Sequence, residues 1–459
     1  MIEKRRTPMR VIFLNIYIFF VICFFVPSTA FAYLDPGTGN ALIYVLLSFG
    51  GAVIYIAKNA FYKFTGSSKK NGKVKENNSV ARSASGIEDT IVLFNEGRIY
   101  WNTFKPIVEA LISKQVLFSY YTMDIDDPCL LIDSPYMRNK YIGKGYFAFH
   151  KLGHLKANVV LSTTPNIGTK GFPVPRSSGI QTLAHVFHAF DDLSCYHKGS
   201  LDHYDAVLLV GPFEIPIIRK LESLRSLPEK ELYPAGLPYL DELYKKKEQC
   251  TAKRLADNTV ITDNNVNEKC TVLIASSWGE KGCLKHYGTT FIEILAKAGF
   301  QVIIRPHPQS LKVERDYING LKNKLLKFGN VQWDFAVDSS ASMQAADILI
   351  SDTSSVRVDF LCVYQKPFIT MPIPFENMQD FELADLKSSW KEEALARIGY
   401  TIKESDLEQI DKIVHSILIS RNQRSIANFR EDHIYNFGHS GEAIAEYLVN
   451  KANYDYDTL

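Results

Sequence analysis

Net charge is nearly absent from this sequence: 52 basic side chains stand against 50 acidic ones, which leaves +2. Bulk electrostatics therefore give no reason to expect a nucleic-acid partner. The seven cysteines are scattered and form no CxxC pair, so free thiols in a reducing compartment are favoured over a disulfide framework. No internal repeat of solenoid period is visible. The 459 residues, 46% of them hydrophobic, are enough for roughly two or three globular domains.

The N-terminus departs from this globular composition. Basic side chains precede an apolar run over 11–26, and the tripeptide AFA at 30–32 follows it, which is the layout of a secretory signal. A second apolar run, 41–57, lies at the lower length limit of a membrane span, and the lysines after it favour the cytoplasmic side. The alternative is a secreted protein in which 41–57 is a core helix, and cleavage after Ala32 stays open. The expected segments are 1–32, a signal peptide or first membrane helix; 33–64, an anchor in the inner membrane; and 65–88, a flexible linker before a region that faces the cytoplasm.

From residue 89 onward, short apolar runs alternate with stretches of helical spacing. Such alternation is typical of a parallel α/β sheet. The runs form two series, so we expect two doubly wound halves, 89–235 and 236–459, with a ligand between them at the carboxyl ends of the strands. The expected strands are 90–94, 116–122, 158–163, 206–211, 271–277, 301–308, 330–335, 347–351 and 367–371, and the clearest helical stretches are 101–113, 289–298, 314–328 and 356–363.

Small polar residues crowd one strand-to-helix turn of the second half. The stretch ADILISDTSSVRVDFL (346–361) has an apolar run on each side of a polar centre. A helix N-terminus presents free N–H groups and the positive end of the helix dipole, which suit a phosphate. We therefore expect the hydroxyls of Thr353, Ser354 and Ser355 to face a phosphate group.

Two acidic residues of the same stretch have supporting roles in this hypothesis. Asp352 would hold the turn beside the phosphate, and Asp359, one helical turn beyond Ser355, would orient that serine. Both are counted among the substrate-binding candidates. The alternative is an ordinary helix cap, because Ser, Thr and Asp are the usual N-cap residues.

Two other strand ends of the second half carry suitable side chains. Arg305 and His307 follow the strand that ends in QVII, and prolines on both sides of the histidine prevent the strand from continuing. An arginine offers a planar charged fork for phosphate oxygens, and a histidine can donate to a phosphate or to a leaving group. In SSWGEKG, Gly279 and Gly282 would let backbone N–H groups approach a ligand. Plain surface turns are the alternative at both places.

The first half concentrates histidines and aspartates in QTLAHVFHAFDDLSCYHKG (181–199). On a helix, His185 and His188 would share a face. No further ligand has zincin spacing, so we expect no metal. A histidine that serves as general base toward the cleft is the sharper hypothesis, and a core histidine is its alternative.

Taken together, these motifs resemble the CDP-glycerol glycerophosphotransferase family of teichoic-acid and capsule polymerases. The resemblance covers roughly residues 155–375 and is most specific in the second half. It includes the hinge segment GLPYLDEL (236–243) and the run HYDAVLLVG. The family motifs Arg-x-His-Pro, Asp-x-Ser-Ser-Val, Asp-Phe and Lys-Pro correspond to Arg305, His307, Pro308, Asp352, Ser354, Ser355, Val356, Asp359, Phe360, Lys366 and Pro367.

The resemblance implies a GT-B fold of two Rossmann-like lobes and the transfer of a phospho-alditol from a CDP-linked donor. His188 would activate a hydroxyl of an envelope glycan or lipid acceptor, and His307 would act with it as the second catalytic residue. The phosphates would be held by Arg305 and by residues 353–355. CMP would be released, and no cofactor is implied beyond the CDP-alditol substrate.

Some positions differ from the family pattern. The family's His-Gly-Thr-Pro is His188-Ala189-Phe190-Asp191 here, and Tyr239 takes the place of the hinge arginine. Two other functions therefore stay open. One is a GT-B glycosyltransferase that uses a nucleotide-sugar donor, and the other is an inactive nucleotide-binding scaffold.

Overall fold

The computed structural model describes residues 89–170, 172–256, 270–336, 338–373, 379–420 and 423–452. The expected signal or first membrane helix (1–32), membrane anchor (33–64) and linker (65–88) lie outside these residues. All of the described residues fall in one compact unit, Ser85–Leu459. Among the described helices, none combines the length and the apolar composition that crossing a bilayer requires.

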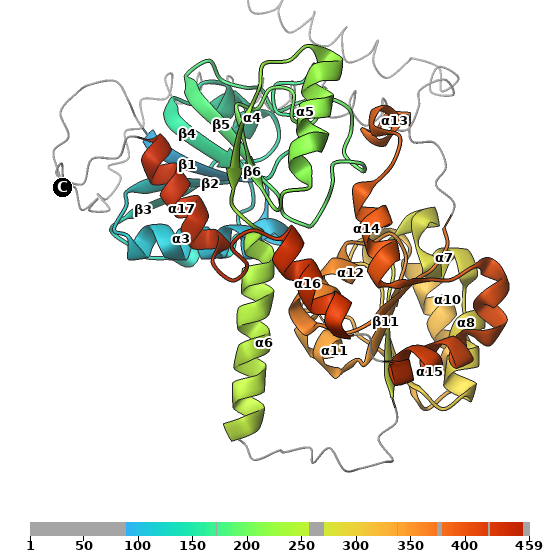
Figure 1. Cartoon of the computed structure of the whole chain (residues 1–459). Coiled ribbons are helices and arrows are strands. Elements are labelled where there is room, and N and C mark those ends of the chain that lie inside the picture. The colour runs from blue at the N-terminus through green and yellow to red at the C-terminus, as the bar shows by residue number, and fades with distance from the viewer. Residues whose placement is uncertain are drawn as a thin grey trace, which may run out of the picture. The chain divides into compact units, whose positions relative to one another are not determined.

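The first lobe is built on a seven-stranded parallel sheet with the strand order β3-β2-β1-β4-β5-β6-β7 (Figure 1). The four strands predicted for this lobe are present as β1, β2, β4 and β6. Strands β3, β5 and β7 were not predicted. The edge strands β3 and β7 were missed because MRNKY and ELYP carry little apolar signal. The strands are β1 (Asp89–Asn95), β2 (Phe118–Thr122), β3 (Met137–Tyr141), β4 (Ala157–Ser162), β5 (Ile180–Val186), β6 (Ala206–Leu209) and β7 (Glu231–Pro234).

The second lobe contains a six-stranded parallel sheet with the order β10-β9-β8-β11-β12-β13. All five strands predicted here are present, and only the two-residue edge strand β13 was missed. In each sheet the strand order reverses beside the first strand, as in doubly wound nucleotide-binding folds, so the prediction of two Rossmann-like lobes is confirmed. The strands are β8 (Thr271–Ala275), β9 (Gln301–Arg305), β10 (Val331–Trp333), β11 (Ile348–Ser351), β12 (Phe368–Thr370) and β13 (Tyr400–Thr401).

Helices cover both faces of each sheet, and the stretches predicted from sequence correspond to α3, α8, α10 and α12. The last of these continues directly into a π-helical turn, Phe360–Tyr364. The helices are α3 (Trp101–Ser113), α4 (Tyr146–Gly153), α5 (Glu214–Arg225), α6 (Pro238–Ala256), α7 (Cys283–Tyr287), α8 (Thr290–Lys297), α9 (Ser310–Val313), α10 (Arg315–Leu325), α11 (Ser340–Ala345), α12 (Val356–Asp359), α13 (Leu383–Leu386), α14 (Trp390–Ile398), α15 (Ile410–Ser420), α16 (Gln423–His433) and α17 (Ser440–Lys451).

The apolar core forms on both sides of each sheet. In α3, residues 104, 107, 108 and 111 are apolar and buried, and this spacing places them on one helical face. That face packs against the first sheet, together with Ile444 and Leu448 of α17. A second cluster joins the two lobes, because it contains Phe187 and Phe213 of the first and Phe360 of the second. The lobes therefore share an apolar contact.

The C-terminal helix returns to the first lobe. Figure 1 shows α17 beside α3. The chain that leads to α17 bonds to the carboxyl ends of β6 and β7, because the Tyr435 N–H donates to the Val210 carbonyl and the Asn436 amide donates to the Pro234 carbonyl. A Cβ at Gly211 would lie 1.9 Å from the His433 carbonyl oxygen, and one at Gly236, where φ is +91°, would lie 2.2 Å from that of Tyr435. Glycine is therefore needed at both places. The domain boundary near residue 236 stays a prediction, but the last helix packs on α3 of the first lobe.

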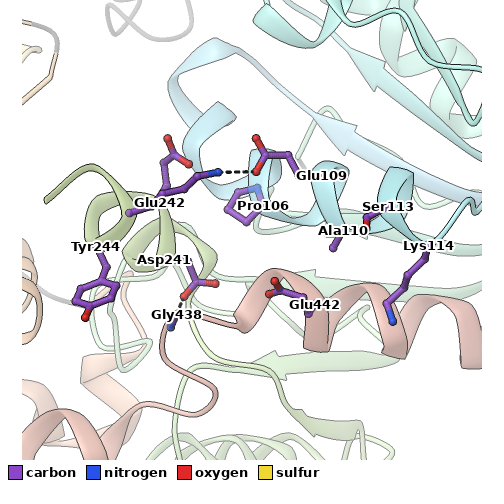
Figure 2. A pocket seen from close by; sticks show the side chains of 11 residues that line it. Pro106, Glu109, Ala110, Ser113, Lys114, Asp241, Glu242, Tyr244, Gly438 and Glu442 are labelled. Carbon is purple, nitrogen blue, oxygen red and sulfur yellow. Dashed lines mark hydrogen bonds and ion pairs between the residues drawn. The ribbon is translucent and has the colours of Figure 1, made fainter. Parts of the chain in front are cut away.

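Asp241 holds the start of the C-terminal helix in place. It lies in the first turn of α6 and is 8% exposed. Its carboxylate accepts hydrogen bonds from the Gly438 N–H (2.8 Å), the Ser440 hydroxyl (3.0 Å) and the Gly441 N–H (3.1 Å), all at the start of α17. Figure 2 shows the side chain next to Gly438. Burial raises the pKa of Asp241 to about 6, although the surrounding donors oppose this shift. The family's hinge aspartate thus serves here as the cap of a distant helix.

We expect Asp241→Ala to lower the free energy of unfolding by about 2–4 kcal/mol, because three buried donors lose their acceptor. Urea unfolding of the full-length chain, followed by circular dichroism, measures this difference. Glu442→Ala is the matched control, since this exposed residue starts the same helix and should change stability by no more than about 0.5 kcal/mol. Equal effects of the two substitutions would contradict the capping role.

Candidate active site

Three predicted strand-end motifs meet at one edge of the second sheet. Arg305 at the end of β9 is paired in register with Ala275 at the end of β8, and Ala275 is paired with Ser351 at the end of β11. The loops that follow these strands are therefore neighbours. The structure brings Arg305, His307, the SSWGEKG loop and residues 352–355 together, as the sequence predicted.

Asp352 ties two of these loops to each other. The side chain is fully buried. It accepts hydrogen bonds from the Ser277 hydroxyl (2.6 Å), the Ser277 N–H (2.9 Å), the Ser276 hydroxyl (3.2 Å) and the N–H groups of Cys283 (2.9 Å) and Ser354 (3.2 Å). Both carboxylate oxygens are thus engaged by the protein. Asp352 holds the turn, as expected, and in this arrangement it acts on a ligand only through the loops that it positions.

The three hydroxyl residues that follow have different surroundings. Ser354 accepts a hydrogen bond from the Val356 N–H, which starts the helical segment Val356–Tyr364. Ser355 donates to the Phe190 carbonyl of the first lobe at 2.8 Å. Among the described residues, no hydrogen bond involves the Thr353 hydroxyl, and its side chain is half-buried. The turn thus offers hydroxyls at the boundary between the lobes.

Arg305 and His307 lie beside this turn. The guanidinium of Arg305 donates to Asp334, which follows β10, at 2.6 Å. Asp352 and Glu314 are the acidic neighbours of the His307 ring, whose Nδ1 accepts from the Gln309 N–H at 3.0 Å. The Nε2 edge carries no such bond among the described residues.

Gly279 is placed in the neighbouring loop with φ +71°. Its N–H donates to Glu314 at 3.2 Å, and the N–H of Gly282 donates to the Gly279 carbonyl. The backbone donors predicted for a ligand are therefore bonded within the protein here.

Asp359 does not orient Ser355, and this part of the hypothesis is wrong. Its carboxylate accepts a hydrogen bond from the hydroxyl of Tyr239 at 3.3 Å. Tyr239 belongs to the first turn of α6, so this contact joins the hinge helix to α12. Burial raises the pKa of Asp359 to about 7. The tyrosine that replaces the hinge arginine thus has a partner of its own.

In the first lobe, the expectation of a helix that carries His185 and His188 is also wrong. His185 belongs to β5, and His188 lies two residues beyond the end of that strand. The run IQTLAHV is buried almost throughout, and such a run has no period by which a central strand is told from a buried helix. The two histidines consequently have separate roles, because only His188 is on the loop at the carboxyl end of the sheet.

His185 is a core histidine, which was the alternative to the general-base hypothesis. It is fully buried, both ring nitrogens lack hydrogen-bond partners among the described residues, and Tyr204 contacts its ring edge-on. Burial lowers its pKa to about 3, so the ring is neutral at pH 7.

His188 is half-buried, and its ring packs edge-on against Tyr100 with the centroids 4.9 Å apart. Its Nδ1 is buried without a hydrogen-bond partner in the described part of the chain. Burial lowers the pKa of His188 to about 4. The imidazole is therefore neutral at pH 7, which is the form that can accept a proton.

Polar residues that no sequence motif indicated surround this histidine loop. Glu96 and Tyr100 follow β1, and Thr163 and Thr164 follow β4, so all four lie at the same sheet edge. The hydroxyl of Thr163 is buried without a partner among the described residues. Burial raises the pKa of Glu96, and a hydrogen bond from Thr164 opposes this shift. Single polar residues after apolar runs give no motif, so the sequence carried no signal for them.

The loop after His188 is held by aromatic packing between the lobes. Phe190 stacks on Phe213 with centroids 5.0 Å apart, and Phe213 stacks on Trp390 of α14 at 4.1 Å. Phe429 of α16 also contacts Phe190. This packing accounts for the phenylalanine at a position where the family has threonine.

Asp192 joins the same loop to α14. Its Oδ2 accepts from the Ser389 hydroxyl and from the Lys391 N–H, each at 2.8 Å. Lys391, which no sequence motif indicated, is 2% exposed. Its Nζ lies 3.4 Å from Asp191 Oδ2 and 3.4 Å from Ser355 Oγ. One lysine thus contacts both the histidine loop and the phosphate-type turn.

A hollow of about 490 Å³ lies elsewhere, between α3, α6 and the start of α17 (Figure 2). Two ion pairs involve its charged side chains: Lys245 donates to Glu109 at 3.0 Å, and Glu242 accepts from Lys105 of α3 at 2.6 Å. These bonds hold helices together. The hollow contains none of the strand-end residues, so we place the site at the sheet edges instead.

Comparison with known proteins agrees with the motifs. Residues 196–380 match the family model described as CDP-Glycerol:Poly(glycerophosphate) glycerophosphotransferase. The wall teichoic acid polymerase TagF aligns with a TM-score of 0.52 and 16% identity over 79% of this chain and 89% of that one. UDP-GlcNAc 2-epimerase of Methanocaldococcus jannaschii, solved with UDP-GlcNAc and UDP, aligns with a TM-score of 0.50 and 15% identity over 79% of this chain and 99% of that one. No curated protein gives a significant match.

The family match confirms the resemblance and the class of enzyme that it implied, one similar to CDP-glycerol glycerophosphotransferases. At these identities the two structures show a shared fold of the GT-B type. The matched range contains Arg305, His307 and the turn at 352–355, whereas His188 and Lys391 lie outside it.

Acid should destabilise the protein through His185. Its pKa in the folded chain is about 3, below the ordinary value near 6.5, so the unfolded chain binds a proton that the folded chain rejects between these pH values. The contribution of the neutral His185 to stability is fully present above about pH 6.5 and is lost as the pH falls. Between pH 7 and pH 5 this histidine should cost about 2 kcal/mol.

Urea unfolding at the two pH values tests this effect. His185→Phe should reduce the loss of stability between pH 7 and pH 5 by about 2 kcal/mol, because the titrating group is gone. His203→Phe changes an exposed histidine of the same lobe and should leave the loss as in the wild type. An unchanged loss in His185→Phe would show that the buried ring is not the source.

Proposed function

We propose, from the match of residues 196–380 to the CDP-glycerol glycerophosphotransferase family, that the protein transfers a phospho-alditol from a CDP-linked donor to a hydroxyl group and releases CMP. Glycerol phosphate is the first candidate for the transferred group, and an envelope glycan or lipid is the acceptor. The observation that carries the proposal is the meeting of Arg305, His307 and residues 353–355 at one sheet edge, in contact with the loop of His188 through Ser355.

The second lobe supplies the groups that a diphosphate needs. The acceptor oxygen attacks the β-phosphorus, a new P–O bond forms, and the bond from that phosphorus to the bridging oxygen breaks, so that CMP leaves with the electron pair. Negative charge builds on the leaving oxygen, and fixed donors that stabilise such charge give a large part of catalysis. Arg305, His307 and the hydroxyl of Thr353 are the side chains that can do so.

The first lobe supplies the base. The acceptor hydroxyl must lose a proton as it attacks, and the neutral His188 can take it. Its position after β5 puts the ring on the same side of the junction as Phe190, whose carbonyl meets Ser355. We infer that the acceptor enters along the first lobe, beside the threonines that follow β4.

We also propose that the enzyme works at the cytoplasmic face of the membrane, as its N-terminal sequence led us to expect. Support comes from exposed apolar side chains: Ile99 is 75% exposed, Ile125 56%, Tyr146 68% and Phe147 74%. They lie on segments that follow β1, β2 and β3, at the same edge of the sheet as the histidine loop. Exposed large apolar groups of this kind favour a membrane surface.

Release of CMP tests the function. Purified full-length protein, given CDP-glycerol and a lipid-linked acceptor, should release CMP, which chromatography measures. His188→Ala should lower kcat by about 10²–10⁴-fold, the usual contribution of general-base catalysis, while the affinity for CDP stays nearly unchanged. His203→Ala, which alters an exposed histidine of the same lobe, should retain activity.

Three results decide between this function and its alternatives. Failure to release CMP from any CDP-alditol, by protein that is folded, would contradict the proposal. Turnover of a UDP-sugar in its place would identify a glycosyltransferase. Loss of CDP affinity together with activity in His188→Ala would assign His188 a structural role.

A further inference from the structure

We propose that Lys391 binds the diphosphate of the donor. The inference rests on the proposed function and adds a substrate-binding residue that lies outside the matched family range. Lys391 occupies the first turn of α14, and its Nζ lies 3.4 Å from the hydroxyl of Ser355. Ser355 is the last residue of the phosphate-type turn. An ammonium group therefore stands beside the hydroxyls that were assigned to the phosphates.

The position of this lysine is fixed by its own backbone. Its N–H donates to Asp192 at 2.8 Å, and Ser389, which caps α14 by accepting from the Glu392 N–H, donates to the same carboxylate. A carboxylate at a helix N-terminus also suits the helix dipole. The start of α14 is thus anchored to the histidine loop, and the side chain of Lys391 extends from an anchored base.

The next residue of the helix anchors it to the phosphate-type turn. Glu392 forms an ion pair with Arg357 at 2.6 Å. Arg357 is fully buried, and its Nε donates to the Ser354 carbonyl at 3.1 Å. Lys391 and Ser355 are therefore held relative to each other by a second set of bonds. A bidentate arginine–carboxylate pair gives such a link a defined geometry.

The ammonium is charged but weakly bonded. Asp191, Cys195 and Asp192 raise the pKa of Lys391 against the effect of burial. A lysine has three N–H donors, and its Nζ has two contacts among the described residues, to Asp191 and to Ser355, both long at 3.4 Å. A phosphate oxygen would accept a shorter, charge-assisted bond. Among the described residues, the two contacts leave one of the three N–H donors for such a bond.

Asp191 balances the charge when no donor is bound. Its Oδ1 is buried without a hydrogen-bond partner among the described residues, and only Oδ2 contacts Lys391. A buried ammonium needs a counter-charge, so removal of the lysine alone leaves a buried carboxylate unpaired. A test must therefore separate the loss of a ligand from the loss of this pair.

Isothermal titration calorimetry of the full-length protein with CDP, CMP and cytidine distinguishes the loss of a phosphate ligand from the loss of the ion pair. Lys391→Met should weaken CDP binding by about 10- to 100-fold, the range for a hydrogen bond to a charged group, and leave cytidine binding unchanged. Lys391→Arg keeps the charge and should stay within about threefold of the wild type. Lys387→Met removes an exposed lysine just before the helix and serves as the matched control.

The double variant Asp191→Asn/Lys391→Met removes both charges, so no unpaired buried charge is left to destabilise the fold. Thermal melting should return toward the wild-type Tm, whereas CDP affinity should remain as low as in Lys391→Met. Recovery of CDP affinity in the double variant would overturn the inference, because the lysine would then only neutralise Asp191. If the wild type binds neither CDP nor cytidine, the proposed function fails, and the inference falls with it.

Discussion

Bonds at the first turn of α14 hold the two halves of the candidate site together. Asp192 of the first lobe accepts two hydrogen bonds from this turn, and Glu392 pairs with Arg357 beside the phosphate-type turn. Since α14 lies between β12 and β13 of the second sheet, these bonds set the distance between His188 and Ser355. In the proposed reaction, transfer between a donor on one lobe and an acceptor on the other depends on that distance, because reacting atoms must be held close and in line.

The departures from the family pattern acquire a physical explanation at this junction. Where the family has Thr-Pro, the chain has Phe190 and Asp191. The phenylalanine fills an aromatic cluster with Phe213 and Trp390, and the aspartate faces Lys391. The altered residues therefore build a contact between the lobes, and His188 itself is retained with a neutral ring. The changed residues therefore have structural roles at this junction, and nothing in their packing favours the hypothesis of an inactive scaffold.

Much of the second lobe could be predicted from the sequence, because its signals are local. Apolar runs marked the strands, and the polar residues after them lie at the shared sheet edge by the rule for parallel strands. The errors have physical causes. The run that contains His185 is buried on both faces and has no readable period. Asp359 has the spacing to reach Ser355, but Tyr239 of the hinge helix bonds it instead.

Contacts between distant segments could not be predicted at all. Lys391 and Asp191 are separated by 200 positions, and Asp241 reaches Gly441 over the same separation. Neither pair leaves a motif in one sequence, since each depends on how the chain crosses between the lobes. The return of α17 to the first lobe is of this kind.

A crystal structure of the full-length protein with CDP would show whether the turn at 353–355 is the diphosphate site. We expect phosphate oxygens within about 3.2 Å of the Thr353 hydroxyl and of Lys391 Nζ, with Arg305 turned toward them from Asp334. CDP bound away from this turn, for example in the hollow between α3, α6 and α17, would contradict this expectation.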